Sequence, residues 1–369
     1  MNNEMHVRTA KGEYTPGSVV NGAVYLHIGS PTEATGVKIS FKGIEKCTYE
    51  YDCDGRKSMK NETVHVYIQE VTLYSQAECF QFGCYVFPFR FELPFDAPGS
   101  FQCIGSSLKG SWTADISYKI QAHAEGADAI QASQTVVVYQ TDEQALSERA
   151  FGSAQEATVE VPRFLLSNKS IHITTKLIDN FVETGSNMQL RLIVTNETRV
   201  TVTGFSVKLV RYFRLFLKDA SVKGSLLENM EMVGDLCHIA PEHGPHVVLT
   251  LAGSSDSVMM GNAGLDRLQI PLRERMSGQS VDIAPSVSAK HTCNRYELEV
   301  SLTFSNNHTE LLTLPVPGVL PKKNKRWSNW KPPEWVYNTE TKLSSSPFSV
   351  PSQVLRTEAF AGLPSFQLL

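Results

Sequence analysis

The sequence predicts an all-β protein made of two tandem immunoglobulin-like β-sandwiches followed by a disordered C-terminal tail. Two observations carry this prediction. Apolar residues alternate with polar ones along many short segments, and the order of these segments repeats in the second half of the chain. The alternation is clearest at 87–93, where Phe87, Phe89 and Phe91 share one face of a predicted strand. Pro88 lacks a backbone N–H, so we expect this strand to pair on one side only at that position.

The first predicted sandwich covers residues 1–140. Residues 14–51 hold two alternating runs, and the polar segment 52–63 is predicted to be the loop at a hairpin tip. A return strand begins at Val64, and another alternating run begins at Trp112. Proline and glycine residues break the chain between 87–93 and the run from Trp112, so we expect these two strands to lie in one sandwich, joined by a long loop.

Residues 141–158 lose the alternation and are rich in Glu, Gln, Ser and Ala, which predicts a linker, with one helical turn as an option. The alternation resumes at Val159, and a second sandwich is predicted over 159–320. Its clearest strand begins at Tyr296, where apolar residues occupy every second position up to Phe304.

Corresponding residues recur at a nearly constant spacing in the two halves. Gly17 and Gly185, each followed by Ser, lie 168 positions apart (185 − 17 = 168). Tyr118 and Tyr296, each starting a short matching run, lie 178 positions apart (296 − 118 = 178). A spacing that grows slowly indicates the same strand order with longer loops, and therefore two sandwiches of one kind.

The composition is that of a soluble globular protein, with 41% hydrophobic and 20% charged residues. The net charge of −4 argues against a general nucleic-acid-binding protein, because such proteins bind by neutralising phosphates. The first residues contain no apolar core of a signal peptide, so we expect a cytoplasmic protein with reduced cysteines.

The sequence shows no spacing typical of an enzyme or a metal centre. It lacks the G-x-S-x-G, P-loop and H-E-x-x-H patterns. One Cys/His cluster lies within ten residues and two cysteine pairs are widely spaced, but neither set has the tight spacing of a zinc site. We therefore predict a protein that is not an enzyme and binds no metal or cofactor. The cluster consists of Cys237, His238, His243 and His246, and the pairs are Cys47 with Cys53 and Cys79 with Cys84.

The tail, residues 321–369, changes composition and holds little that could form a core, so we predict that it is disordered. Its first part carries a basic cluster beside tryptophans, which is a candidate contact for anionic membrane or, alternatively, a solubilising flank. The cluster consists of Lys322, Lys323, Lys325 and Arg326.

A second tail motif, KPPEW, is similar to the PPxY ligand of WW domains, although Trp stands where Tyr is expected. The alternative is that the tryptophans fold back onto a sandwich, because clustered tryptophans are rarely exposed. The candidate partner-binding residues of this motif are Pro332, Pro333, Trp335 and Tyr337.

The order and the amino-acid sequences of these segments resemble those of the arrestin family over about residues 5–320. The resemblance is carried by YTPGSVVNGAVYLHI, GVKISFKGIE, FPFRFELPFDAPGSF and SWTADISYKIQAHAEG in the first half, and by VPRFLLSNKSIHITTKLID, GSNMQLRLIVTNET and NRYELEVSLTF in the second. It implies an arrestin N-type and a C-type sandwich around a hinge, without an active site.

The resemblance also suggests a phosphate-sensing polar core, which one branch of the family has. Arg163 in VPRFLLS stands where that branch has its phosphate-sensing arginine, and Asp266 in GLDRL is a candidate for a core aspartate. The first sandwich has Ser18 where the branch has another aspartate, which argues against phosphate-triggered activation.

The resemblance implies a cytoplasmic, non-catalytic adaptor at the plasma membrane or endosomes. Such a protein binds the cytoplasmic tails of membrane proteins and links them to endocytic or ubiquitination machinery, for example a WW-domain ubiquitin ligase. The alternative within the same fold is a retromer-type coat subunit in endosomal sorting, whose partners are endosomal coat subunits. A third hypothesis, a metal-dependent or redox enzyme built on sandwiches, is supported by the Cys/His cluster and the cysteine pairs alone.

Overall fold

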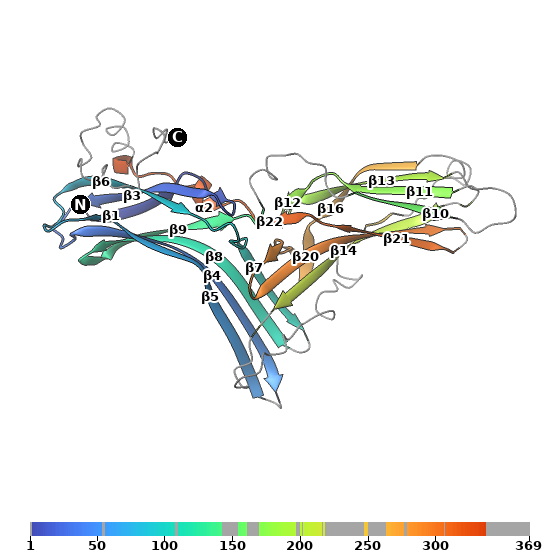
Figure 1. Ribbon diagram of the computed structural model, residues 1–369, viewed down its shortest axis with the longest axis horizontal. Helices are drawn as coiled ribbons and strands as arrows, with labels where there is room; N and C mark the ends of the chain where they lie inside the picture. Colours follow the sequence, from blue (N-terminus) through green and yellow to red (C-terminus); the bar gives the residue numbers. More distant parts are fainter. Residues whose placement is uncertain are drawn as a thin grey trace.

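A computed structural model describes residues 2–53, 56–107, 110–141, 154–160, 170–196, 200, 202–215, 217, 247–249, 263–276, 279–305 and 307–336. Two β-sandwiches lie side by side, with the N-terminal sandwich at the left of Figure 1 and the C-terminal sandwich at the right. The predicted all-β fold is confirmed, and α2 (Lys325–Ser328) is a single short helical turn. No helix of these residues is long and apolar enough to cross a bilayer.

The N-terminal sandwich consists of two sheets packed around one apolar core. A three-stranded sheet has the order β1-β3-β6, and a six-stranded sheet has the order β2-β9-β8-β4-β5 with β7 paired to β8. The strands are β1 (Glu4–Thr9), β2 (Glu13–Tyr14), β3 (Val19–Ile28), β4 (Gly36–Cys53), β5 (Arg56–Ser75), β6 (Gly83–Glu92), β7 (Phe101–Ser107), β8 (Gly110–Glu125) and β9 (Ala127–Val138).

The clearest alternating runs of the sequence form opposite layers of this sandwich. Phe87, Phe89 and Phe91 on β6 are buried, as are Trp112 and Tyr118 on β8. Among the strands of the described residues, β6 pairs with β3 alone, as expected from Pro88. Because β6 and β8 lie in different sheets, their inward faces meet across the core.

The segment 52–63 corrects a prediction, since most of it is strand rather than loop. β4 continues to Cys53 and β5 begins at Arg56, and their ladder pairs Thr63 with Lys46 and Lys57 with Asp52. The side chains here are polar because both faces of the projecting hairpin are largely exposed, so the sequence lacks the apolar alternation that marks a half-buried strand.

The C-terminal sandwich has a four-stranded sheet of order β10-β11-β13-β16 and a five-stranded sheet of order β15-β14-β20-β19, in which β21 also pairs with β20. Two small sheets, β12-β22 and β17-β18, complete it. The strands are β10 (Ala154–Glu160), β11 (Ser170–Leu177), β12 (Phe181–Glu183), β13 (Asn187–Asn196), β14 (Val202–Leu215), β15 (Val247–Leu249), β16 (Ala263–Pro271), β17 (Arg273–Met276), β18 (Gln279–Asp282), β19 (Val287–Ser288), β20 (Thr292–Phe304), β21 (Thr309–Pro315) and β22 (Gly318–Leu320). β10 begins inside the predicted 141–158 linker, so that segment is shorter than expected.

The structure confirms the repeat at the level of hydrogen bonds. Gly17 and Gly185 both have positive φ, 76° and 80°, and the serine after each glycine returns its backbone N–H to the carbonyl three residues earlier, at 3.1 Å. The Tyr118 hydroxyl donates to a buried loop carbonyl at 2.6 Å, and that of Tyr296 donates to another at 2.7 Å. Glycine suits both turns because other residues rarely adopt positive φ.

Candidate functional site

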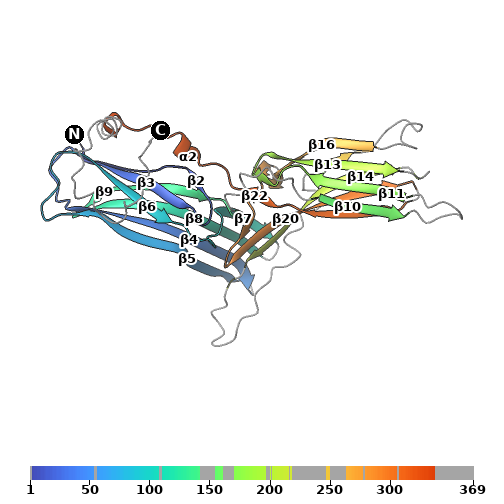
Figure 2. The ribbon, with the colours of Figure 1, turned by 45° about the horizontal axis from the view of Figure 1, so that its top comes forward.

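The first part of the predicted disordered tail is ordered, which corrects that prediction. Residues 321–336, which we call the strap, leave the C-terminal sandwich after β22 and pass over the N-terminal sandwich. Figure 2 shows α2, in red, on the outer surface of that sandwich above β2 and β3. Residues 338–369 and the predicted contact residue Tyr337 lie outside the described residues.

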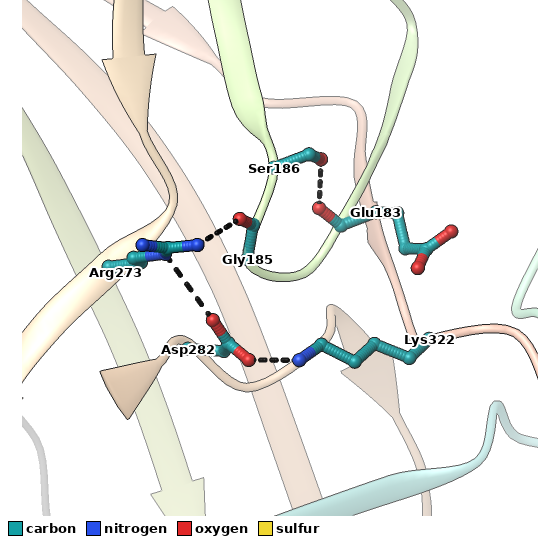
Figure 3. A network of polar contacts seen from close by, with 6 residues as sticks. All are labelled: Glu183, Gly185, Ser186, Arg273, Asp282 and Lys322. Atoms are coloured by element: carbon teal, nitrogen blue, oxygen red, sulfur yellow. Dashed lines mark hydrogen bonds and ion pairs between the residues drawn. The ribbon is translucent and has the colours of Figure 1, made fainter. Parts of the chain in front are cut away.

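An ion-pair network fastens the beginning of the strap to the C-terminal sandwich (Figure 3). The Lys322 ammonium contacts one carboxylate oxygen of Asp282, and the Arg273 guanidinium lies 3.6 Å from the other. Arg273 also donates to the Gly185 carbonyl at 3.2 Å. Lys322, predicted to be a basic membrane contact, is therefore engaged within the protein.

Asn324 attaches the strap to the N-terminal sandwich and starts α2. Its backbone N–H donates to Glu13 Oε1 at 2.6 Å, and its side-chain amide donates to the Thr135 carbonyl at 2.7 Å. Its Oδ1 accepts from the backbone N–H of Trp327 at 3.1 Å, as in the N-terminal cap of a helix. One buried residue, through its backbone N–H and its side chain, thus joins β2, β9 and the strap.

Trp327 and Trp330 enclose the guanidinium of Arg8 from β1. The Arg8 Cζ atom lies 4.0 Å from the ring centroid of Trp327 and 5.0 Å from that of Trp330. The Trp327 indole N–H donates to the Thr9 carbonyl at 2.9 Å. Gly12 allows this approach, because a Cβ there would meet the Trp327 ring at 3.1 Å. Cation–π contacts of this kind strengthen when the cation is partly desolvated, and burial does lower the pKa of Arg8.

Trp335 and Val336 complete the docking. The Trp335 ring centroid lies 5.7 Å from that of His6 and 5.4 Å from that of His27, and its indole N–H donates to Glu4 Oε2 at 3.1 Å. Val336 is fully buried against Ala23 and Tyr25 of β3, with Val86 of β6 beside them. This arrangement matches the alternative in which the tryptophans fold back onto a sandwich.

The candidate WW-domain ligand therefore lies in a docked segment. Pro332 is exposed, Pro333 is half-buried, and Trp335 contacts the sandwich. The predicted basic residues Lys323, Lys325 and Arg326 are exposed along the same strap. The structure thus brings Lys323, Lys325 and Arg326 close in sequence to the docked motif on the N-terminal sandwich, whereas Lys322 is held at the C-terminal sandwich.

The predicted polar-core residues are not brought together by the described part of the chain. Arg163 lies outside the described residues. The backbone of Asp266 lies in β16, but its side chain is not among those that the structure describes. The Cys237 cluster also lies outside. Among the side chains that the structure does describe, no group of three or more His, Cys, Asp or Glu is placed to hold a metal ion.

The structure reveals a polar interface between the sandwiches that the sequence analysis missed. Arg211 from β14 donates to Asn294 Oδ1 at 2.8 Å and lies 2.8 Å from Cys103 Sγ of β7. Glu45 from β4 is fully buried and accepts the backbone N–H of His291 at 3.0 Å. The sequence could have indicated this interface, because both charged residues occupy alternating positions of their strands that otherwise hold inward-facing apolar residues.

A buried thiol of the same interface also joins the two sandwiches. Cys47 Sγ lies 3.1 Å from Thr292 Oγ1, and burial raises the pKa of Cys47 to about 11. A thiol with such a pKa stays protonated at neutral pH and is a poor nucleophile, so it serves packing rather than chemistry.

The comparisons with known proteins agree with this architecture. Residues 4–142 match the family model of the arrestin (or S-antigen) N-terminal domain. The chain is 24% identical over 207 residues to arrestin domain-containing protein A of Dictyostelium discoideum. The matched region covers 53% of this chain and 35% of that relative. The chain thus spans about a third of the length of the relative. The first sandwich thus matches the arrestin N-terminal domain over its whole length, and this match, the similarity to that relative and the repeated β-sandwich support an arrestin-family assignment.

Proposed function

We propose that this chain is an adaptor that binds cytoplasmic parts of membrane cargo or receptors and links them to endocytic or ubiquitination machinery. The family assignment supports an adaptor-like, non-catalytic role, since arrestin-family proteins are generally non-catalytic adaptors. The protein would act in the cytoplasm, peripherally at the plasma membrane or endosomes.

The observation that carries the cargo-binding part is the free edge of β5. This strand of 20 residues pairs with β4 on one side, and no other strand of the described residues pairs with its outer edge. Met59 and Ile68 are exposed along it. An extended peptide can add to such an edge through main-chain hydrogen bonds while its side chains contact the exposed ones. An unstructured cytoplasmic tail of a membrane protein has the chain form that this mode requires.

The test is affinity purification with mass spectrometry from detergent-solubilised cells, comparing the wild type with an edge variant, Met59→Lys with Ile68→Lys. Lysines on an edge strand disfavour the addition of another strand. We expect membrane proteins to co-purify with the wild type and to be lost with the edge variant. A matched control is Leu311→Lys on β21, whose side chain is 54% exposed, compared with 58% for Ile68. Equal recovery with all three proteins would reject β5 as the cargo site.

A truncation after Leu320 tests the second partner in the same experiment. If ubiquitin ligases with WW domains co-purify with the full chain and disappear with the truncation, the PPEW segment is a WW ligand. Recovery of the same ligases with both chains would place their binding site on the sandwiches instead.

A retromer-type coat subunit is the second candidate, and the docking of Trp335 favours it. While Trp335 and Val336 pack against the N-terminal sandwich, the motif is not presented as a free extended ligand. A partner that binds the sandwiches has no need of that motif. Co-purification of endosomal coat subunits with both the full chain and the truncation would select this function.

A further inference from the structure

The strap has an aromatic face and a basic face that point in different directions. Its three tryptophans are half-buried toward the N-terminal sandwich, whereas all of its cations are exposed. Lys322 is exposed but paired with Asp282, and the four other exposed cations, Lys323, Lys325, Arg326 and Lys331, form what we call the basic ridge. The basic residues of the tail are therefore held in place by aromatic anchors.

The strap concentrates positive charge in an acidic protein. Residues 321–336 carry five cations and one anion, Glu334, so their net charge is +4 (5 − 1 = 4). The whole chain has a net charge of −4, which leaves −8 on all other residues (−4 − 4 = −8). A solubilising role would not require this segregation, because the rest of the chain is already far from neutral.

The basic ridge is also free of internal partners. Lys322 is paired with Asp282, but the four ridge cations form no ion pair within the described residues. They are spread along residues 323–331 and share no common hydrogen-bond acceptor there. A site for a single phosphate needs cations that converge on one group, whereas an anionic bilayer presents many charges over a plane.

We propose that the basic ridge is a docking surface for a bilayer rich in anionic phospholipid, which holds the N-terminal sandwich at the membrane. The attraction is electrostatic, because the tryptophans are engaged with Arg8, His6 and His27 rather than exposed for insertion. The ridge is ordered before it meets the membrane, so binding requires little further loss of backbone freedom. Binding of this kind weakens as salt screens the charges.

Co-sedimentation of the full chain with vesicles tests the proposal. We expect the protein to bind phosphatidylcholine vesicles that contain phosphatidylserine, to bind pure phosphatidylcholine much more weakly, and to dissociate as salt is raised. Changing all four ridge cations to Gln should weaken binding by at least about a hundredfold, because each charge near an anionic surface contributes roughly a factor of five and the four factors multiply.

A matched control removes four exposed cations from strands of the same sandwich: Lys46→Gln, Arg56→Gln, Lys57→Gln and Lys119→Gln. Both variants have the same net charge, so equal loss in both would mean general electrostatic attraction and would overturn the proposal. It is also overturned if the ridge variant binds vesicles normally but loses only a soluble phosphorylated peptide, or if the wild type does not bind the vesicles. The outcome is separable from the adaptor proposal, since cargo capture by β5 is measured in detergent without vesicles.

Discussion

At the scale of single residues, the strap packs against a histidine whose pKa is lowered by burial. His6 lies against Trp330 and Trp335, with ring centroids 6.2 Å and 5.7 Å away. Burial lowers the pKa of His6, while the nearby Glu4 acts in the opposite direction and only partly offsets it. Arg8 on the same strand and His27 of β3 add two further basic groups beside the tryptophans.

We predict that docking of the strap weakens on acidification. When the strap is released, the pKa of His6 returns to its ordinary value of about 6.5, which is above its pKa in the docked form. The released form then binds more protons as the pH falls through and below about 6.5, so acid shifts the equilibrium toward release until His6 is protonated in both forms. Tryptophan fluorescence between neutral pH and about pH 5.5 measures this, since three of the four tryptophans lie in the strap.

His6→Gln should flatten this pH profile, because the titrating group is removed. His65→Gln on the exposed β5 strand is the matched control and should leave the profile as in the wild type. A profile that His6→Gln does not change would assign the pH dependence to another group.

At the scale of the element, the strap is held by side chains rather than by a sheet ladder. Its residues after β22 are helical at Lys325–Ser328 and again at 334–336, and their contacts come from Lys322, Asn324, the three tryptophans and Val336. Segments held by a few side-chain contacts open locally with less free energy than core strands. The stability of the strap therefore depends on each aromatic anchor.

Trp327→Ala should release the strap, so that its backbone can unfold and bind trypsin at the basic residues. The change removes the stacking on Arg8 and the hydrogen bond to Thr9, a loss of about 2 kcal/mol for a half-buried aromatic side chain. Cleavage within 322–331, followed by mass spectrometry under native conditions, should accelerate by about tenfold or more. Ser328→Ala alters an exposed side chain of the same turn and should cleave at the wild-type rate. Equal rates for all three proteins would show that Trp327 does not limit opening.

At the scale of the whole molecule, the two sandwiches share an apolar and polar interface. Phe213, Leu215, Ala284 and Val287 of the second sandwich join the core cluster of the first. The Phe213 ring stacks on Phe101 and Trp112, with centroids 6.2 Å and 6.1 Å away. The backbone N–H and the carbonyl of Ser288 also bind the Gln140 side-chain amide, at 2.7 Å and 2.8 Å. We expect this interface and the strap to fix the relative position of the sandwiches.

Phe213→Ala should therefore loosen the pair of sandwiches while leaving each folded. Removing a buried phenylalanine costs about 3–5 kcal/mol, and here the loss falls on the interface. Small-angle X-ray scattering should show a larger radius of gyration for this variant. Phe304→Ala, equally buried within the second core, should lower stability without changing the native scattering curve. A wild-type scattering curve for Phe213→Ala would mean that the strap and the polar contacts suffice.

The sequence by itself determined the fold class, the repeat and the family resemblance. Alternation at Phe87, Phe89 and Phe91 and the recurrence of Gly17 at Gly185 are local properties that any strand and turn must show, so they can be read without tertiary information. Predictions from composition were wrong where polar segments are ordered although much of their surface is exposed. The polar β4–β5 hairpin was predicted as a loop, and the basic start of the tail was predicted as disordered.

Only the tertiary structure decided where the long-range contacts lie. Docking of Trp327 depends on Gly12 and Arg8, more than three hundred positions earlier, and no local pattern encodes that pairing. Glu45 and Arg211 are charged residues at inward-facing positions that are otherwise apolar. This makes them unusual in the sequence, but only the structure identifies their hydrogen-bond partners. Alternation tells which face of a strand is buried, whereas the packing of the two sandwiches and the strap decides what buries it.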